Sequence, residues 1–248
     1  MDENKTEKQR HITITTRILL VTMLVILVFT VFSAPVSAAD LHVGLSQTYS
    51  TIQAAINAAS PYDTIIVHDG TYNENVEVDK SHLTIHSHNG SSFTTVSASL
   101  NPDDHVFNIT DQTNVTLEGF EIRDANGTSQ GVAGIYMDNA SDCNISDNIV
   151  MNISATGWNN AFGILLWDSS NNTFSFGSIS DINAPIWWDF YSGSDSHGNS
   201  AENITISSYP TTISFTYDNG IAIKSEETPP AGGATAAFLI PALGNSRI

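Results

Sequence analysis

Apolar and polar residues alternate in short runs along most of the chain, and clusters of Asn, Asp, Ser and Gly separate these runs. Helical spacing is confined to residues 50–59, where Ser50 is the expected N-cap and Pro61 follows the end of the helix. The apolar run 64–67 predicts a first strand, and Asp69-Gly70 predicts the turn after it. As far as the C-terminal tail, the remaining pattern predicts short strands joined by turns.

These predicted strands repeat along the chain. Leu117, Ile145, Phe174 and Ile206 occupy equivalent places, 28, 29 and 32 residues apart, and the runs Gly134-Ile-Tyr and Gly163-Ile-Leu lie 29 apart. A repeat of strands and turns without helices is typical of a parallel β-solenoid, in which equivalent inward residues stack from coil to coil. We therefore predict an all-β solenoid of about six coils over residues 40–222, roughly 30 Å long, with the short N-terminal helix covering its first coil.

One corner of each coil is also marked in the repeat. Asn148 and Gly177 align directly after the inward pair of residues, and Gly119 lies close to the same place. Gly and Asn are the residues that most readily adopt a positive φ. We therefore expect left-handed backbone conformations at these three positions.

The first 39 residues have the composition of an export segment. Residues 1–17 are basic, residues 18–39 carry no charge, and small residues precede two candidate cleavage points, after Ala38 and after Ala39. The alternative is an uncleaved membrane anchor, because 22 uncharged residues can just span a bilayer. Residues 1–39 are thus predicted to be a signal peptide or an anchor, and this segment would make any membrane contact. Residues 223–248 are predicted to be a linker with a short apolar tail.

The charge balance and the cysteine count exclude some classes of protein. Three of the 26 acids and four of the eight bases precede residue 18, so the remainder has 23 acids and four bases, a net charge of −19. Such a body lacks the basic surface that nucleic-acid binding requires. A single cysteine, Cys143, excludes a disulfide scaffold. Both observations fit an exported protein located outside the cell or at its surface.

Nine Asn-x-Ser/Thr sequons are candidate glycosylation sites in an exported chain. They begin at Asn89, Asn108, Asn114, Asn126, Asn139, Asn144, Asn152, Asn171 and Asn203. The alternative is that these residues serve the tight turns between strands.

Several stretches resemble a known family. Residues 49–59, 63–67 and 69–78, with Leu83-Thr-Ile85 and Asn89-Gly90, are similar to the N-terminal cap and first coils of pectin-lyase-like right-handed parallel β-helix proteins. The runs Gly134-Ile-Tyr and Asn144-Ile-Ser-Asp-Asn-Ile resemble NosD-type repeats, which also occur in archaeal cell-surface proteins, particularly of methanogens. The resemblance covers about residues 48–210. It implies a right-handed β-helix, and it raises polysaccharide chemistry as a function to be tested.

The catalytic groups that this resemblance implies are incomplete in the sequence. A lyase of this fold implies bound calcium and a basic residue, yet the predicted β-helix contains only Lys80 and Arg123, and the neighbours of Arg123 are acids. A hydrolase needs paired carboxylates; Asp168, Asp181 and Asp189 are candidates, but the polygalacturonase motifs are absent. Residues 70–74 resemble pectin esterases, without the later catalytic motifs. We therefore predict no catalytic residue.

Two kinds of metal site have candidate ligands. His82, His86 and His88 alternate with apolar residues, so they are expected on one outward face, where imidazoles could bind copper or zinc. Asp138, Asp142 and Asp147 are candidates for calcium at the coil corners. The alternative for both sets is a solvated surface.

Aromatic residues gather late in the repeat and are candidates for carbohydrate binding. They are Trp158, Trp167, Trp187, Trp188 and Tyr191. An exposed indole offers a flat face to a sugar ring, whereas the competing interpretation is an aromatic cap over the last coils.

The leading hypothesis is therefore an exported, non-catalytic β-helix protein of the cell surface, serving in a surface layer, adhesion or carbohydrate binding. Its expected partners are cell-envelope glycans or other surface proteins. The alternatives are a pectin-lyase-like carbohydrate-active enzyme and a NosD-like periplasmic copper-handling module.

Overall fold

The structure is a computed structural model that describes residues 13–23, 37–98, 103–156, 160–175, 177–183, 186–192, 196–206, 211–217, 221–223 and 240–241. The chain divides into two units, Met1–Ser37 and Ala38–Ile248. In the first unit residues 13–23 are helical. In the part of the chain that the structure describes, no helix has the length and apolar character needed to cross a membrane. Most of the uncharged segment, residues 24–36, lies outside the described residues, so the export prediction stays a prediction.

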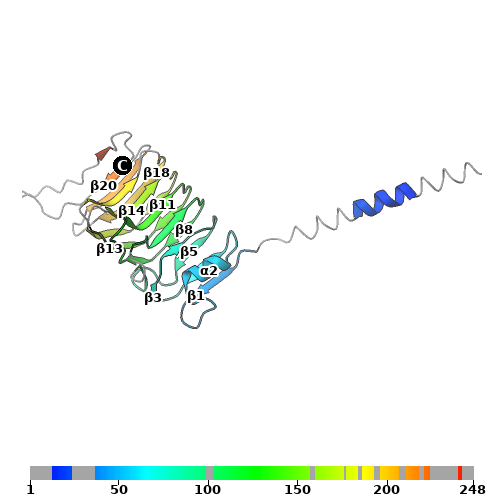
Figure 1. The fold of residues 1–248 in the computed structure, drawn as a ribbon, viewed down its shortest axis with the longest axis horizontal. Helices are drawn as coiled ribbons and strands as arrows, with labels where there is room; N and C mark the ends of the chain where they lie inside the picture. Colours follow the sequence, from blue (N-terminus) through cyan, green and yellow to red (C-terminus); the bar gives the residue numbers. More distant parts are fainter. Residues whose placement is uncertain are drawn as a thin grey trace, which may run out of the picture. The chain divides into compact units, whose positions relative to one another are not determined.

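The second unit is a parallel β-solenoid of about five turns, close to the six expected from the repeat. Figure 1 shows its strands stacked in order, from β1 and the helix α2 at one end to β18 and β20 at the other. Each turn contributes a strand to each of three walls.

The first wall contains β1 (Asp40–Val43), β2 (Thr64–Val67), β5 (Thr84–Ser87), β8 (Thr116–Glu118), β12 (Asn144–Ser146), β15 (Thr173–Ser175) and β18 (Asn199–Ile206). The second contains β3 (Gly70–Asn73), β6 (Thr94–Ser97), β9 (Glu121–Arg123), β13 (Ile149–Ala155) and β16 (Ser178–Asn183), with β10 (Asn126–Gly127) paired to β13. The third contains β4 (Val76–Glu77), β7 (Phe107–Thr110), β11 (Val132–Asp138), β14 (Asn160–Trp167) and β17 (Ile186–Ser192).

The register of the first wall confirms most of the predicted repeat. Leu117 pairs with Ile145, and Ile145 with Phe174, at the expected spacing. The assignment of Ile206 to this column is wrong. Phe174 pairs with Ala201, and Ile206 pairs with Ile179 in the second wall. The long strand β18 joins both walls, so it contributes one apolar residue to each of the two columns, Ala201 to the first wall and Ile206 to the second.

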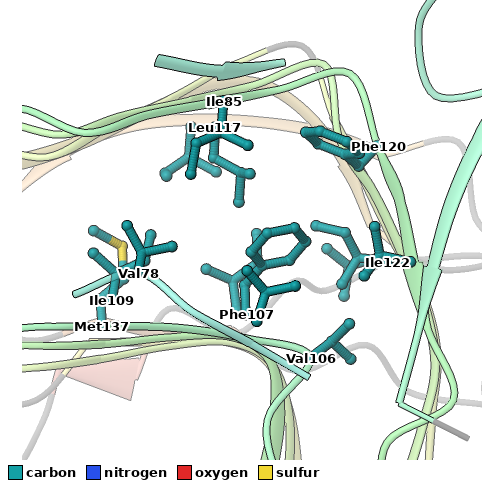
Figure 2. Packing of buried hydrophobic residues seen from close by; sticks show 14 of the residues in the cluster. Val78, Ile85, Val106, Phe107, Ile109, Leu117, Phe120, Ile122 and Met137 are labelled. Carbon is teal, nitrogen blue, oxygen red and sulfur yellow. The ribbon is translucent and has the colours of Figure 1, made fainter. Parts of the chain in front are cut away.

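Inward side chains from the three walls form one apolar core. Figure 2 shows Ile85 and Leu117 stacked on one side, Ile109 and Met137 on the other, and Phe107 between them. The Phe107 ring lies in the middle and the Phe120 ring lies beside it toward the corner, with centroids 5.7 Å apart and planes tilted by 46°. Each such fully buried side chain contributes about 1.5–3 kcal/mol through removal of apolar surface from water. Stacking the coils is therefore what makes the short strands stable.

The helix α2 (Ile52–Ala58) lies at the N-terminal end of the core, as predicted, with shifted boundaries. Its N-cap is Thr51 and not Ser50, because the Thr51 side chain accepts a hydrogen bond from the Ala54 N–H at 3.2 Å. The carboxylate of Glu74 accepts from two further N–H groups of the first turn. At the other end, Lys80 Nζ donates to the carbonyls of residues 56, 57 and 59 at 2.7–2.8 Å. Opposite charges thus occupy the two ends of the helix dipole.

The predicted corner is present, but its conformations differ from the expectation. Gly119 has a φ of +78°, as expected, whereas the left-handed residue of the next coil is Asp147 and not Asn148. Asn148 instead points inward and is buried: its Oδ1 accepts from the Phe120 N–H at 3.0 Å, and its Nδ2 donates to the Leu117 carbonyl at 2.9 Å. Gly177 is also not among the left-handed residues, and a Cβ there would lie 2.7 Å from the Asn148 carbonyl oxygen. Asn148 and Gly177 therefore serve hydrogen bonding and close packing.

Aspartate and asparagine occupy the left-handed positions at other corners, stacked in columns. The columns are Asn114, Asp142 and Asn171; Asp111, Asn139 and Asp168; and Asp124, Asn152 and Asp181, all with φ between +46° and +70°. Backbone hydrogen bonds from Asp111 to the carbonyl of Asp138, and from Asn139 to that of Trp167, keep these corners in register. Both residue types tolerate a positive φ, which accounts for their place at these corners.

Antiparallel strands end the stack. β19 (Thr211–Tyr217) pairs with β18, β20 (Ile221–Ile223) pairs with β17, and β21 (Ile240–Pro241) pairs with β20. The predicted linker and tail over 223–248 lie outside the described residues apart from residues 223, 240 and 241.

Candidate functional site

The outer side of the third wall presents aromatic and polar side chains together, and we call its residues Asn108, Thr110, Tyr136, Asp138, Leu165 and Trp167 the aromatic face. In β11, Ile135 and Met137 are fully buried, so the alternation of a strand turns Tyr136 and Asp138 outward. In the neighbouring strand β14, Leu165 pairs with Tyr136 and Trp167 pairs with Asp138. The parallel register therefore places Tyr136 and Trp167 diagonally on adjacent strands.

Tyr136 is held by contacts on two sides. Its ring stacks on His105, with centroids 4.3 Å apart and planes 19° from parallel. Its hydroxyl donates to Asp138 Oδ2 at 3.2 Å. Burial, followed by the charge of Asp138, raises the pKa of Tyr136 to about 12, so the hydroxyl remains a donor at neutral pH. The ring thus has a fixed orientation before any ligand arrives.

His105 supports this arrangement as a neutral imidazole. Its Nδ1 accepts a hydrogen bond from the Ala133 N–H at 2.9 Å, which requires that nitrogen to be unprotonated. Burial lowers the pKa of His105 against a smaller opposing effect of Asp104. The histidine therefore connects the start of β11 to the ring of Tyr136.

Trp167 supplies the exposed part of the aromatic face. It is 43% exposed, and it is followed by the exposed corner residue Asp168. Asn108 and Thr110 lie on β7, on the other side of β11 from Trp167, where the Thr110 hydroxyl donates to Asn108 Oδ1 at 2.7 Å. The face thus combines a flat indole with carboxylate, amide and hydroxyl groups, which suits a sugar ring that has both apolar C–H faces and hydroxyls.

The other predicted aromatic residues are only partly placed. Trp158 lies outside the described residues. Trp187, Trp188 and Tyr191 belong to β17, and the backbone of Tyr191 pairs with Leu165, so it continues the column of Tyr136. Their side chains are outside the described part. Sequence reasoning missed Tyr136 and His105 as site residues and considered Asp138 only for calcium. The alternation over 135–138 would have indicated an outward tyrosine.

The structure does not assemble His82, His86 and His88 into one site. His82 stacks on Tyr62 at 4.7 Å, and its Nδ1 lies 3.1 Å from Asn114 Nδ2. His86 Nδ1 lies 3.0 Å from the Ser87 carbonyl, and His88 stacks on His68 at 4.8 Å. His82 has a φ of +62°, so a turn interrupts the alternation on which the prediction relied. Within the described ranges, no group of three or more His, Cys, Asp or Glu side chains is placed to hold a metal ion.

The calcium candidates are likewise separate. Asp138 ends β11, Asp142 precedes β12 at a corner, and Asp147 follows β12 at the next corner. They therefore belong to three different places on the same coil.

The candidate catalytic groups have structural partners or lie apart. Arg123 forms ion pairs with Glu121 and Asp124, each at 3.1 Å, and hydrogen bonds to them raise its pKa. The acidic neighbours that the sequence places beside Arg123 are therefore its partners. Lys80 is occupied by the end of α2. Asp168 lies at the end of β14 and Asp181 within β16, while the side chain of Asp189 is outside the described residues.

The predicted sequons occupy accessible positions. Seven of their asparagines are exposed, and Asn108 and Asn126 are half-buried. Five of them, at 114, 139, 152, 171 and 203, have positive φ. Both proposed roles, turn formation and glycan attachment, are therefore compatible with the same residues.

An open groove of about 740 Å³ runs along the corner between the first and second walls. Its polar lining comes from His86, His88, Glu118 and Asp147. Gly119 and Gly177 also line it, and they have no side chain to fill the space. Alignment of glycines at this corner was visible in the sequence, but the groove itself depends on the stacking of the coils.

No family model matches the chain. A cell surface glycoprotein of the archaeon Methanothermus fervidus is 33% identical over 138 residues, which are 55% of this chain and 21% of that protein. The chain therefore spans about a fifth of that relative's length. The sequence similarity is distant, and it agrees with the expected resemblance to archaeal cell-surface proteins; the NosD part of the prediction stays a prediction.

Solved structures of pectin-active enzymes are similar at low sequence identity. Carrot pectin methylesterase is 14% identical with a TM-score of 0.43, covering 71% of this chain and 65% of that one. A rhamnogalacturonan lyase is 10% identical with a TM-score of 0.44, covering 73% and 60%. Pectin methylesterase PemA from Erwinia chrysanthemi is 12% identical with a TM-score of 0.39, covering 60% and 56%. The β-helix assignment rests on the chain's own strand register, and these likenesses imply no activity.

Proposed function

We propose that this chain is an exported, non-catalytic β-helix module of the cell surface that binds glycans through the aromatic face. The observation that carries the proposal is the placement of Trp167 and Tyr136 on adjacent strands, one exposed and the other held by His105 and Asp138. Because Tyr136 is already held in one orientation, it loses little conformational entropy when a flat ligand binds.

Location at the cell surface is supported by two independent features. The N-terminal segment has an export composition, and the chain is distantly similar to a cell surface glycoprotein. The accessible sequons are further support, because an exported chain can be glycosylated at exposed asparagines.

The charges around the aromatic face indicate the class of glycan. Asp138 lies within the face and Asp168 directly follows Trp167. Carboxylates repel acidic sugars and attract amino sugars. We therefore expect neutral or amino-sugar glycans of the envelope as ligands, in preference to polyuronates.

The contacts of the two described basic side chains of the β-helix support a binding role over the enzyme alternative. Proton abstraction in a lyase needs a base that is free to approach the substrate. Lys80 donates to three helix carbonyls and Arg123 is paired with two carboxylates. A carbohydrate-active enzyme therefore remains the second candidate, with less support from the described residues.

The proposal is tested by affinity electrophoresis of the purified chain in gels containing neutral, amino-sugar or uronate polysaccharides. We expect retardation by the first two classes, and at least a fivefold loss of affinity in Trp167→Ala and Tyr136→Ala. Tyr62→Ala is the matched control, because Tyr62 is 62% exposed and lies just before β2, away from the strands of the aromatic face. Equal retardation of all three variants contradicts the aromatic face as the binding site, and measured turnover of an acidic polysaccharide contradicts the non-catalytic assignment.

A further inference from the structure

Three imidazole rings stack at the N-terminal end of the solenoid, on three successive turns. His42 lies in β1, His68 follows β2 and His88 follows β5. The His42 and His68 centroids are 5.2 Å apart, and those of His68 and His88 are 4.8 Å apart. Backbone hydrogen bonds continue the ladder past the strand ends, from His68 N–H to Val43 and from His88 N–H to Val67. The stack is therefore positioned by the main chain.

Two ring nitrogens in this stack face each other directly. His42 Nδ1 and His68 Nε2 are 3.0 Å apart. In the absence of an ion one of them donates a proton to the other. An ion 2.0–2.1 Å from both nitrogens would subtend an N–metal–N angle of roughly 90–95°, which is the angle between neighbouring ligands in tetragonal Cu²⁺ coordination.

The charges around the pair favour a cation. Neutral imidazole is the form that binds a metal ion. Asp69 contributes a nearby negative charge, and its Oδ1 accepts from Asn89 Nδ2 at 2.9 Å. The net charge of −19 from residue 18 onward raises the local concentration of cations.

From this geometry we infer that His42 Nδ1 and His68 Nε2 form a two-histidine site for a late first-row divalent cation, Cu²⁺ or Zn²⁺, with water in the remaining positions. The site differs from the predicted set of His82, His86 and His88, none of which contributes a ligand. Because the protein supplies two ligands, the ion exchanges readily and the site is open to a third donor from solution.

The test is titration of the purified full chain with CuCl₂, and separately with ZnCl₂, followed by calorimetry. The variants His42→Phe and His68→Phe keep a ring in the stack while removing the facing nitrogen. We expect each to weaken binding of one equivalent of ion at least tenfold, whereas His82→Phe leaves affinity unchanged within twofold. The electron paramagnetic resonance spectrum of the Cu²⁺ form should show coupling to two imidazole nitrogens.

A second measurement uses the unsubstituted chain, so the inference stays testable if a variant fails to fold. Substoichiometric Cu²⁺ should broaden the ring resonances of His42 and His68 first in histidine-labelled protein. Broadening that begins at His82 or His105, or unchanged affinity in both His42→Phe and His68→Phe, overturns the assignment.

Discussion

Asn139 Nδ2 donates to Asp111 Oδ1 over 2.7 Å, which joins the same corner position of two successive turns. Asn152 makes the same contact to Asp124 at 2.6 Å. In both columns the amide lies between two carboxylates, those of Asp111 and Asp168 or of Asp124 and Asp181. Like charges directly opposite each other destabilise neighbouring strands. Because amides and carboxylates alternate along each column, the acidic solenoid stacks its corners without such contacts.

Replacing the amide in one column should therefore destabilise the fold. We expect Asn139→Asp to lower the free energy of unfolding by about 1 kcal/mol in low salt, because a donor is lost and three carboxylates then follow each other. Added salt should restore part of the loss by screening. Thermal unfolding at two ionic strengths measures this. Asn144→Asp is the control, since Asn144 is exposed and pairs with Thr116 and Thr173; an equal loss there would contradict the role of alternation.

The buried amide of Asn148 should be worth more than any exposed one. Its removal in Asn148→Ala takes the acceptor away from the Phe120 N–H and one donor away from the Leu117 carbonyl, both inside the core. We expect a loss of about 1–3 kcal/mol, the cost of one unsatisfied buried group. Urea unfolding measures the free energy of unfolding of Asn148→Ala, and Asn144→Ala is the control because Asn144 is exposed. A loss below 1 kcal/mol would show that water replaces the amide.

Gly134 is expected to tolerate no side chain. A Cβ at this position would lie 2.3 Å from Val150 Cγ1 and 2.9 Å from the Gly163 carbonyl oxygen. Gly134→Ala should therefore cost about 1–3 kcal/mol through overpacking. In Gly131→Ala the nearest atom lies at 3.3 Å, so a smaller effect is expected. Equal midpoints of denaturant unfolding for the two variants would contradict this account.

His105 should make stability depend on pH in a defined direction. Its pKa in the folded state is lowered from 6.5, mainly by burial, so the unfolded chain binds more protons just below pH 6.5. The contribution of His105 to the free energy of unfolding is fully present above pH 6.5. It is lost as the pH falls from 6.5 through the pKa of His105 in the folded state. His105→Asn keeps an acceptor for the Ala133 N–H, so it should reduce the fall in melting temperature between pH 7.5 and pH 5.5. A pH profile for His105→Asn that runs parallel to that of the unsubstituted chain would refute the assignment.

The amino-acid sequence by itself predicted the parallel β-solenoid fold. Alternation within strands and a repeat of 28–29 residues are properties of local sequence, and they correctly placed the column from Leu117 to Phe174. The export composition and the excess of acids were equally visible without coordinates. Inward positions are predictable because every coil must fill the same apolar space.

The outward contacts were decided only by the stacking of the coils. The 3.0 Å approach of His42 and His68, the stacking of His105 on Tyr136 and the inward turn of Asn148 join residues 26–31 positions apart. Which outward residues meet depends on the register between coils and on the length of each corner. The misplacement of Ile206, 32 residues after Phe174 where the true partner Ala201 follows by 27, shows that an irregular spacing leaves the register open. Periodicity therefore specifies the core of this protein, whereas its candidate binding sites depend on corner geometry that exists only once the coils are stacked.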